Sequence, residues 1–223
     1  MLVTAFNMRK SSDITDSTSL ALSKVRVEQY DHGKRIIDIT GSAFLLLTTA
    51  PVMLCVAAAV YVDSGRPVVY LQKRLTQGGR VFTIFKFRTM RKDAEAKSGA
   101  VWAQLKDPRI TKIGHFLRIT RLDELPQLFN VLLGDMSLIG PRPERPELAK
   151  ELAKQFPSFN RRLEVKAGIT GLAQVSSGYA SSVDSYRRKL ALDLLYIKKR
   201  CFLLDIQIAL KTVIVILTGS GAR

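Results

Sequence analysis

The sequence is poor in the residues that build disulfide frameworks and metal clusters. It has 2 cysteines and 2 histidines among 223 residues. Cys55 lies in an apolar run and Cys201 lies far away beside a basic cluster, so the two do not share a metal-like spacing. The cysteines therefore indicate a reducing compartment. A chain of this length builds one ordinary domain plus an attachment device, and not two large cores.

Acidic residues are also scarce. Lysine and arginine number 35 against 19 acidic residues, which gives a net charge of 35 − 19 = +16. Such a balance favours a polyanionic partner, which leaves nucleic acid, anionic membrane lipid and phosphorylated substrates as classes. The chain has no recognisable reading helix and no stacking aromatics on a basic face, so we expect no nucleic acid partner.

The first 32 residues carry no cleavable signal, because the stretch before Met8 is too short for an apolar signal core. We interpret residues 1–32 as a flexible polar leader. Residues 36–62 then form an apolar run with a single charge, Asp38, and this run is long enough to cross a bilayer. The sequence therefore predicts a membrane element over residues 33–65.

Both flanks of this run are basic. Lys34 and Arg35 precede it and Arg66 follows it, so each end has the signature of a cytoplasmic face. Pro51 lies in the middle, where it removes a helical hydrogen bond, and adjacent threonines can satisfy freed carbonyls. We therefore predict a re-entrant helix that enters and leaves on the same side. A plain spanning helix and a buried helix of a soluble protein remain as alternatives.

Residues 66–223 read as a helix-rich α/β domain. Residues 68–71 and 81–88 alternate like strands around the Gly78-Gly79 turn, which predicts a β-hairpin. On the second strand Lys86 and Arg88 alternate with phenylalanines, so one face is cationic; it either binds substrate or is a solvated edge. Helices are expected at the following ranges: residues 92–97, 110–120 and 122–133.

An acidic pair, Asp123 and Glu124, precedes Pro126. Proline is tolerated in the first turn of a helix, so the pair should lie at a helix N-terminus. Unpaired N–H groups there attract phosphate and keep carboxylates ionised, which suits a nucleophile. An acidic pair in a first turn is otherwise an ordinary cap.

Two arginines lie on either side of this pair in the sequence. Arg118 is upstream, and Arg142 lies downstream between Pro141 and Pro143, whose φ angles are fixed. A guanidinium held in this way suits bidentate recognition of phosphate. We therefore take Arg118, Arg142, Lys86 and Arg88 as candidate substrate-binding residues.

At these residues the chain resembles the monotopic bacterial sugar transferases, which are small polyprenyl-phosphate phosphoglycosyl transferases. The likeness covers about residues 33–223. The motifs that carry it are residues 34–38 (KRIID), 86–90 (KFRTM), 122–127 (LDELPQ), 140–143 (GPRP) and 168–175 (GITGLAQV).

The resemblance implies a re-entrant helix, a compact cytosolic α/β core and amphipathic helices on the membrane interface. The apolar residues 202–217 are a candidate interfacial helix, or else an amphipathic core helix. The membrane motif would comprise Lys34, Arg35, Asp38 and Pro51, with Asp38 in an ion pair with Arg35. Relatives often have serine before the proline, where this chain has Ala50, and often continue with Gly-Arg after the residue matching Val175.

For chemistry, the resemblance implies transfer of a sugar 1-phosphate from a UDP-sugar to undecaprenyl phosphate, which starts assembly of a surface polysaccharide or glycoconjugate. Asp123 would be the nucleophile of a covalent intermediate, and Glu124 would be a catalytic residue and the ligand of Mg²⁺. The enzyme would lie in the bacterial cytoplasmic membrane with its catalytic domain facing the cytoplasm. A homodimer is a further partner that the sequence allows. Two alternatives remain: direct attack by the lipid phosphate without an intermediate, and a noncatalytic basic membrane scaffold.

Overall fold

The computed structural model describes residues 2–94, 107–177 and 183–218, with side chains from residue 28 onward. The chain divides into two units, Met1–Ile37 and Asp38–Arg223. In chain order the elements are α1 (Leu2–Ser64), β1 (Val69–Leu75), η1 (Gln77–Gly79), β2 (Val81–Phe87), α2 (Lys112–Thr120), η2 (Leu122–Glu124), α3 (Gln127–Leu133), β3 (Met136–Ile139), α4 (Pro146–Gln155), η3 (Phe159–Glu164), β4 (Ala167–Thr170), α5 (Leu172–Ser176), α6 (Val183–Lys199) and α7 (Phe202–Thr218).

The first unit is formed by the beginning of α1. The sequence predicted a flexible leader over residues 1–32, whereas the backbone is helical from Leu2 onward. Residues 1–32 contain neither glycine nor proline, so nothing in their composition ends a helix there. The assignment of these residues to a separate leader stays a prediction.

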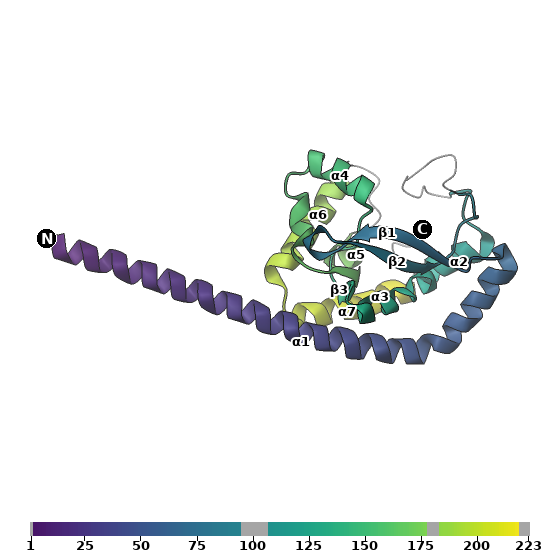
Figure 1. Cartoon of the computed structure of the whole chain (residues 1–223), viewed down its shortest axis with the longest axis horizontal. Helices are drawn as coiled ribbons and strands as arrows, with labels where there is room; N and C mark the ends of the chain where they lie inside the picture. Colours follow the sequence, from purple (N-terminus) through teal and green to yellow (C-terminus); the bar gives the residue numbers. More distant parts are fainter. Residues whose placement is uncertain (1, 95–106, 178–182, 219–223) are drawn as a thin grey trace. The chain divides into compact units, whose positions relative to one another are not determined.

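The second unit begins in the apolar half of α1. In the described part of the chain, Glu28–Ser64 is the one helix with the length and composition to cross a membrane. It stays helical through Pro51, and Figure 1 shows it bending in its blue portion. Thr48 Oγ1 donates to the Phe44 carbonyl at 3.0 Å and Thr49 Oγ1 donates to Leu45 at 2.6 Å. Such hydroxyl bonds favour bending, so the helix stays continuous through Pro51 and curves.

Asp38 joins this helix to β3 in the same unit. Its side chain is 2 % exposed, and Oδ1 accepts hydrogen bonds from Ser137 Oγ at 3.0 Å and from Leu138 N at 2.9 Å, both in β3. The sequence had assigned this carboxylate to an ion pair with Arg35. Arg35 belongs to the first unit, and that ion pair stays a prediction.

The predicted hairpin is confirmed. Strands β1 and β2 pair antiparallel, with Tyr70 opposite Lys86 and Arg74 opposite Phe82, and Figure 1 shows them as neighbouring arrows. The turn contains Gly78 at φ 69° and Gly79 at φ 76°, a conformation that glycine adopts without a steric cost. On the inner face of β2, Phe82 and Ile84 pack in a core with Val131 and Met136.

A second, parallel pair, β3 and β4, supports the loop that follows β3. A Cβ atom at Gly168 would lie 2.1 Å from the backbone nitrogen of Gly140, so no larger residue fits between these strands. Gly168 N donates to the carbonyl of Pro141 at 2.9 Å. This close contact fixes where residues 140–143 leave the sheet.

The other predicted helices are found in part. Residues 110–120 contain α2 as expected. Residues 92–94 form a turn rather than the start of a helix, and residues 95–97 lie outside the described residues. The expected helix over residues 122–133 divides into the 3-10 turn η2 and the shorter α3.

Candidate active site

Asp123 and Glu124 lie in the turn η2 between α2 and α3. Arg121 ends α2 with φ 61°, and Pro126, which has no N–H to donate, precedes the first residue of α3. The sequence had predicted the pair in the first turn of a helix. The structure instead places it in the turn just before α3. Both side chains are buried, with 8 % and 9 % of the residue exposed.

Glu124 is ion-paired with two cations from distant parts of the sequence. Lys86 Nζ lies 2.9 Å from Oε1, and Arg142 Nη2 lies 2.7 Å from the same oxygen. Burial opposes ionisation, but Arg142 and Lys86 hold the pKa of Glu124 well below its usual value. In return, Glu124 raises the pKa of Arg142, and burial lowers that of Lys86. Glu124 is therefore ionised and its Oε1 is fully engaged.

Asp123 has a different environment. In residues 28–94, 107–177 and 183–218, no group forms a hydrogen bond or ion pair with its carboxylate. Burial and the charge of Glu124 raise the pKa of Asp123 to about 6, while Lys86, Arg118 and Arg142 oppose this shift. At neutral pH the carboxylate is mostly ionised, close to three cations, and its oxygens are not occupied by an ion pair. This is the state that a nucleophile requires.

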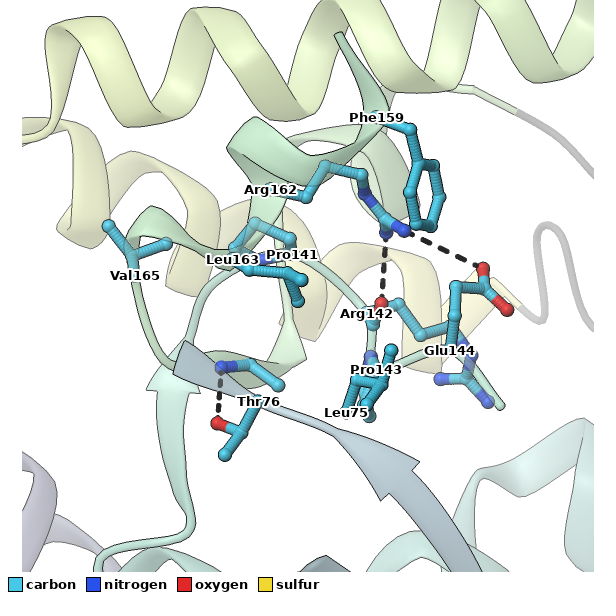
Figure 2. A pocket seen from close by; sticks show the side chains of 11 residues that line it. Leu75, Thr76, Pro141, Arg142, Pro143, Glu144, Phe159, Arg162, Leu163 and Val165 are labelled. Carbon is cyan, nitrogen blue, oxygen red and sulfur yellow. Dashed lines mark hydrogen bonds and ion pairs between the residues drawn. The ribbon is translucent and has the colours of Figure 1, made fainter. Parts of the chain in front are cut away.

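Arg142 reaches this site from a loop that other charged residues hold in place. Arg74 Nη1 donates to the carbonyl of Pro143 at 3.0 Å, and Arg162 Nη2 donates to the carbonyl of Arg142 at 2.9 Å. Figure 2 shows Arg162 between that carbonyl and Glu144, in a recess that Phe159 and Leu163 also line. The backbone of the loop is thus fixed by hydrogen bonds that are separate from the bond between the Arg142 side chain and Glu124.

Arg162 is itself paired in the interior. Its Nε lies 2.7 Å from Oδ2 of Asp193 on α6, and both side chains are at least nine-tenths buried. Sequence reasoning missed Arg74, Arg162 and Asp193. No local pattern marks the bonds of Arg162 to Asp193 and to the Arg142 carbonyl, or that of Arg74 to the Pro143 carbonyl, because the partners lie 20 or more residues apart along the chain.

Arg88 has a different environment from the one predicted. Its side chain is buried, and Nη2 donates to the carbonyl of Ser64, to Ser64 Oγ at 3.1 Å and to the carbonyl of Gly65 at 2.6 Å. These groups are at the C-terminal end of α1. Of the four predicted substrate-binding residues, Lys86 and Arg142 contact Glu124 and Arg118 acts on Asp123, while Arg88 anchors the membrane element.

The remaining sequence features bear less directly on this site. Pro51 lies inside α1, and Lys34 and Arg35 belong to the first unit. Of the stretch where relatives continue with Gly-Arg, Gly178 and Tyr179 lie outside the described residues.

Comparison with known families agrees with this geometry. Residues 29–219, which include every residue of the acidic and cationic cluster, match the model of the bacterial sugar transferase family. The chain belongs to this family.

Several relatives of this bacterial sugar transferase carry functional names. The chain is 44% identical over 190 residues to UDP-N-acetylgalactosamine-undecaprenyl-phosphate N-acetylgalactosaminephosphotransferase of Aeromonas hydrophila. This match covers 85% of the chain and 45% of the relative. It is 43% identical over 159 residues to the putative undecaprenyl-phosphate N-acetylgalactosaminyl 1-phosphate transferase of Bacillus subtilis (strain 168), covering 71% and 88%. It is 38% identical over 194 residues to UDP-glucose:undecaprenyl-phosphate glucose-1-phosphate transferase of Caulobacter vibrioides, covering 86% and 72%.

The lengths of these relatives differ. The sugar transferase described here spans about half of the Aeromonas relative but most of the Bacillus relative. The names of the three relatives also specify two different sugars, N-acetylgalactosamine and glucose. The comparisons therefore establish the family but do not specify which sugar a member with this sequence uses.

Proposed function

We propose that this protein transfers a sugar 1-phosphate from a UDP-sugar to undecaprenyl phosphate, and so starts assembly of a surface polysaccharide or glycoconjugate. The named relatives support the two substrates. The observation that carries the proposal is the contrast within the acidic pair. Glu124 binds Lys86 and Arg142, while Asp123 is buried beside the same charges without a bond of its own among the described residues.

In the proposed reaction, a carboxylate oxygen of Asp123 attacks the sugar-proximal phosphorus of the donor. A bond forms between this oxygen and phosphorus, the bond from phosphorus to the bridging oxygen breaks, and UMP leaves with the electron pair. An oxygen of undecaprenyl phosphate then attacks the same phosphorus, and Asp123 leaves as a carboxylate. Splitting the transfer in this way is typical of nucleophilic catalysis and gives ping-pong kinetics.

The cations around the pair have separate roles in this scheme. A carboxylate that approaches a diphosphate meets strong repulsion, so charge must be neutralised where it develops. Arg142 and Lys86 are fixed by Glu124, and Arg118 adds a third charge beside Asp123. We assign them to the phosphate oxygens of the donor.

Magnesium fits this site through Glu124. The described part of the chain has no group of three or more His, Cys, Asp or Glu side chains that could hold a metal ion. Mg²⁺ usually binds one or two carboxylates and takes its other ligands from water and substrate phosphates. Both ion pairs of Glu124 use Oε1, so Oε2 is the oxygen assigned to the ion. When bound, Mg²⁺ would neutralise charge on the donor diphosphate.

The surface of the second unit supports a place at the cytoplasmic face of the membrane. Large apolar side chains on the membrane half of α1 are exposed, including Phe44 at 66% and Leu54 at 73%. Helix α7 exposes Leu203, Leu210 and Leu217 while it buries Asp205 and Ile208. Anionic lipid would attract the net charge of +16. We propose that α1 is re-entrant and that α7 lies on the interface.

The test is UMP release from a UDP-sugar in the presence of undecaprenyl phosphate and magnesium. We expect Asp123→Asn to lose turnover by at least about a thousandfold, because an amide is not a nucleophile here. Asp184→Asn is the matched control, since that aspartate is on the surface with its side chain 87% exposed. If Asp123→Asn keeps the wild-type rate, the assignment is wrong, and a noncatalytic scaffold would show no UMP release in any variant.

A further inference from the structure

Arg88 is a buried cation without a carboxylate partner in the described part of the chain. Only 6% of the residue is exposed, and no acidic side chain in residues 28–94, 107–177 and 183–218 forms an ion pair with it. The other buried arginine of these ranges, Arg162, pairs with Asp193 at 2.7 Å. A buried charge is costly unless an opposite charge compensates it. The contrast indicates that Arg88 is suited to receive an anion.

The guanidinium of Arg88 uses one of its three nitrogens in the fold. Nη2 donates to the carbonyls of Ser64 and Gly65 and to Ser64 Oγ. Nε and Nη1 are buried and have no hydrogen-bond partner among the described residues. A guanidinium has only donors, and buried donors are nearly always paired in native proteins. The N–H groups of Nε and Nη1 are therefore matched to acceptor oxygens of a ligand.

This cation is next to the reaction centre along the hairpin. Arg88 N donates to the carbonyl of Val68 at 2.9 Å, so the strand pairing of β2 continues to Arg88. Residues two apart on a strand share a face, with about 7 Å between their Cα atoms. Lys86, two residues before Arg88, bonds to Glu124 through its Nζ. Arg88 thus extends the cationic face of β2 away from the acidic pair.

The same region contains the end of the apolar helix. Phe87 packs in one core with Val60 of α1, and Leu122, which immediately precedes Asp123, packs against this core. The carbonyls that Arg88 binds are at the C-terminal end of α1. Arg88 therefore contacts the end of the membrane element beside the core that supports the acidic turn.

We propose that Nε and Nη1 of Arg88 bind the phosphate of the acceptor, undecaprenyl phosphate, and hold it for attack on the phosphorus at Asp123. The inference rests on the proposed function. Arg142, Lys86 and Arg118 are assigned to the phosphates of the donor, so a separate cation is left for the second phosphate. That phosphate arrives from the membrane, and Arg88 contacts the end of the helix that we propose to enter the membrane.

Burial of Arg88 favours this role. In a site that excludes water, the attraction between a guanidinium and a phosphate is stronger than on the surface. The side chains that cover Nε and Nη1 move aside when the lipid phosphate enters. The phosphodiester of an anionic headgroup offers similar charged oxygens, so the experiment has to separate the acceptor from a bound membrane lipid.

The experiment measures the kinetics of both substrates in the purified full-length protein, in detergent with magnesium. Arg88→Gln keeps one amide donor for the end of α1 and removes the charge. We expect the KM for undecaprenyl phosphate to rise at least about tenfold, because a charge-assisted hydrogen bond is lost. The KM for the UDP-sugar should stay within twofold of wild type. Arg88→Lys has one nitrogen for two tasks, so its KM for the lipid should also rise, but less.

Two controls separate this role from anchoring of α1. Ser64→Ala removes an oxygen that accepts from Nη2 and leaves Nε and Nη1 unchanged. Arg91→Gln removes an exposed arginine three residues further along the chain. Both variants should have wild-type KM values for the two substrates. If Arg88→Gln loses only the response to added phosphatidylglycerol, with an unchanged KM for undecaprenyl phosphate, the site binds a headgroup and the inference is wrong.

The inference is also overturned if the Arg88 variants leave both KM values unchanged, or raise both in the same proportion, because Arg88 then only anchors α1. If Arg88→Gln does not fold, the two KM values of Arg88→Lys decide the question. These failures are distinct from failure of the proposed function. If the wild-type enzyme releases no UMP from any UDP-sugar in the presence of the lipid, the proposed function is wrong, and this inference is lost with it.

Discussion

At the scale of single residues, the chemistry depends on two adjacent carboxylates with opposite environments. Glu124 is paired with Lys86 and Arg142, and its pKa is held well below the usual range. Among the residues that the structure describes, Asp123 is buried without such a pair, and its pKa is raised to about 6. Neighbouring groups whose pKa values are pushed apart often have different roles in catalysis, and the roles we propose here are a fixed counter-charge for Glu124 and a nucleophile for Asp123.

The first prediction concerns pH. Only the ionised form of Asp123 attacks, so kcat/KM for the donor should fall as pH is lowered, with an apparent pKa near 6. Arg118 lowers the pKa of Asp123, so Arg118→Gln should move this acid limb to higher pH. Arg187→Gln removes an exposed arginine and should leave the profile unchanged. An identical acid limb in Arg118→Gln would contradict the proposed electrostatic contact.

The second prediction concerns stability. A carboxyl whose pKa is raised on folding binds more protons in the folded state, so its contribution to the free energy of unfolding falls as pH rises from about 4 to 6. Asp123→Asn removes the free-energy cost of ionising this buried carboxyl. It should therefore stabilise the inactive enzyme at pH 7.5 by up to about 3 kcal/mol. The measurement is Tm in detergent without magnesium or donor. A variant less stable than wild type would show that Asp123 has a stabilising partner.

At the scale of elements, the backbone of the loop with Arg142 is held by charged residues of η3 and α6. Arg162 donates to the Arg142 carbonyl and pairs with Asp193 in the interior. Lysine cannot reproduce both bonds, because it lacks the planar fork of arginine. The pair thus positions the guanidinium of Arg142, which we propose to bind phosphate.

The third prediction follows from this pair. Arg162→Lys should lower kcat/KM for the donor about tenfold to a hundredfold, with a smaller effect on the KM for undecaprenyl phosphate. The matched control is Arg161→Lys, since Arg161 is 62% exposed and pairs only with the surface carboxylate of Glu164 among the described residues. Equal effects of the two variants on both substrates would contradict the positioning role.

The fourth prediction tests the contact between β3 and β4. Gly168→Ala would place a methyl group 2.1 Å from backbone nitrogen of Gly140, and backbone cannot move aside as a side chain can. We expect a loss of about 2–4 kcal/mol in stability, seen as a lower Tm. Gly41→Ala meets only the end of the Leu138 side chain, at 2.9 Å, and should cost much less. Equal Tm values would show that the strands are not in close contact.

The comparison of sequence and structure separates local from long-range information. The hairpin was predictable because strand alternation and the Gly78-Gly79 turn are local patterns. The acidic pair and Arg142 were recognisable from short motifs. The role of Arg88 was not, since its partners lie at the end of α1, more than 20 residues away. For the same reason the bonds of Arg74 and Arg162 could not be read from any local pattern.

At the scale of the whole molecule, the proposed enzyme works where a soluble donor meets a lipid acceptor. Its +16 charge and its exposed apolar helices suit an anionic membrane surface. The re-entrant topology that we propose requires both ends of the apolar part of α1 to be on the cytoplasmic side. It would place the catalytic domain at the level of the phosphate of undecaprenyl phosphate.

The fifth prediction tests this topology. In a background with Cys55 and Cys201 replaced by serine, single cysteines at His32 and Asp63 should both react with a membrane-impermeant maleimide in inside-out vesicles. Neither should react in intact spheroplasts. A spanning helix would instead expose one position in each preparation, which would contradict the re-entrant arrangement.

The central claim is that Asp123 carries the phosphosugar between the two half-reactions. Incubation of the protein with UDP-sugar and magnesium, without lipid, followed by intact-mass and peptide mass spectrometry, tests it directly. The account predicts one added phosphosugar on the peptide that contains Asp123, absent from Asp123→Asn and lost when undecaprenyl phosphate is added. An unmodified enzyme that releases UMP only when the lipid is present would contradict it and would indicate direct attack.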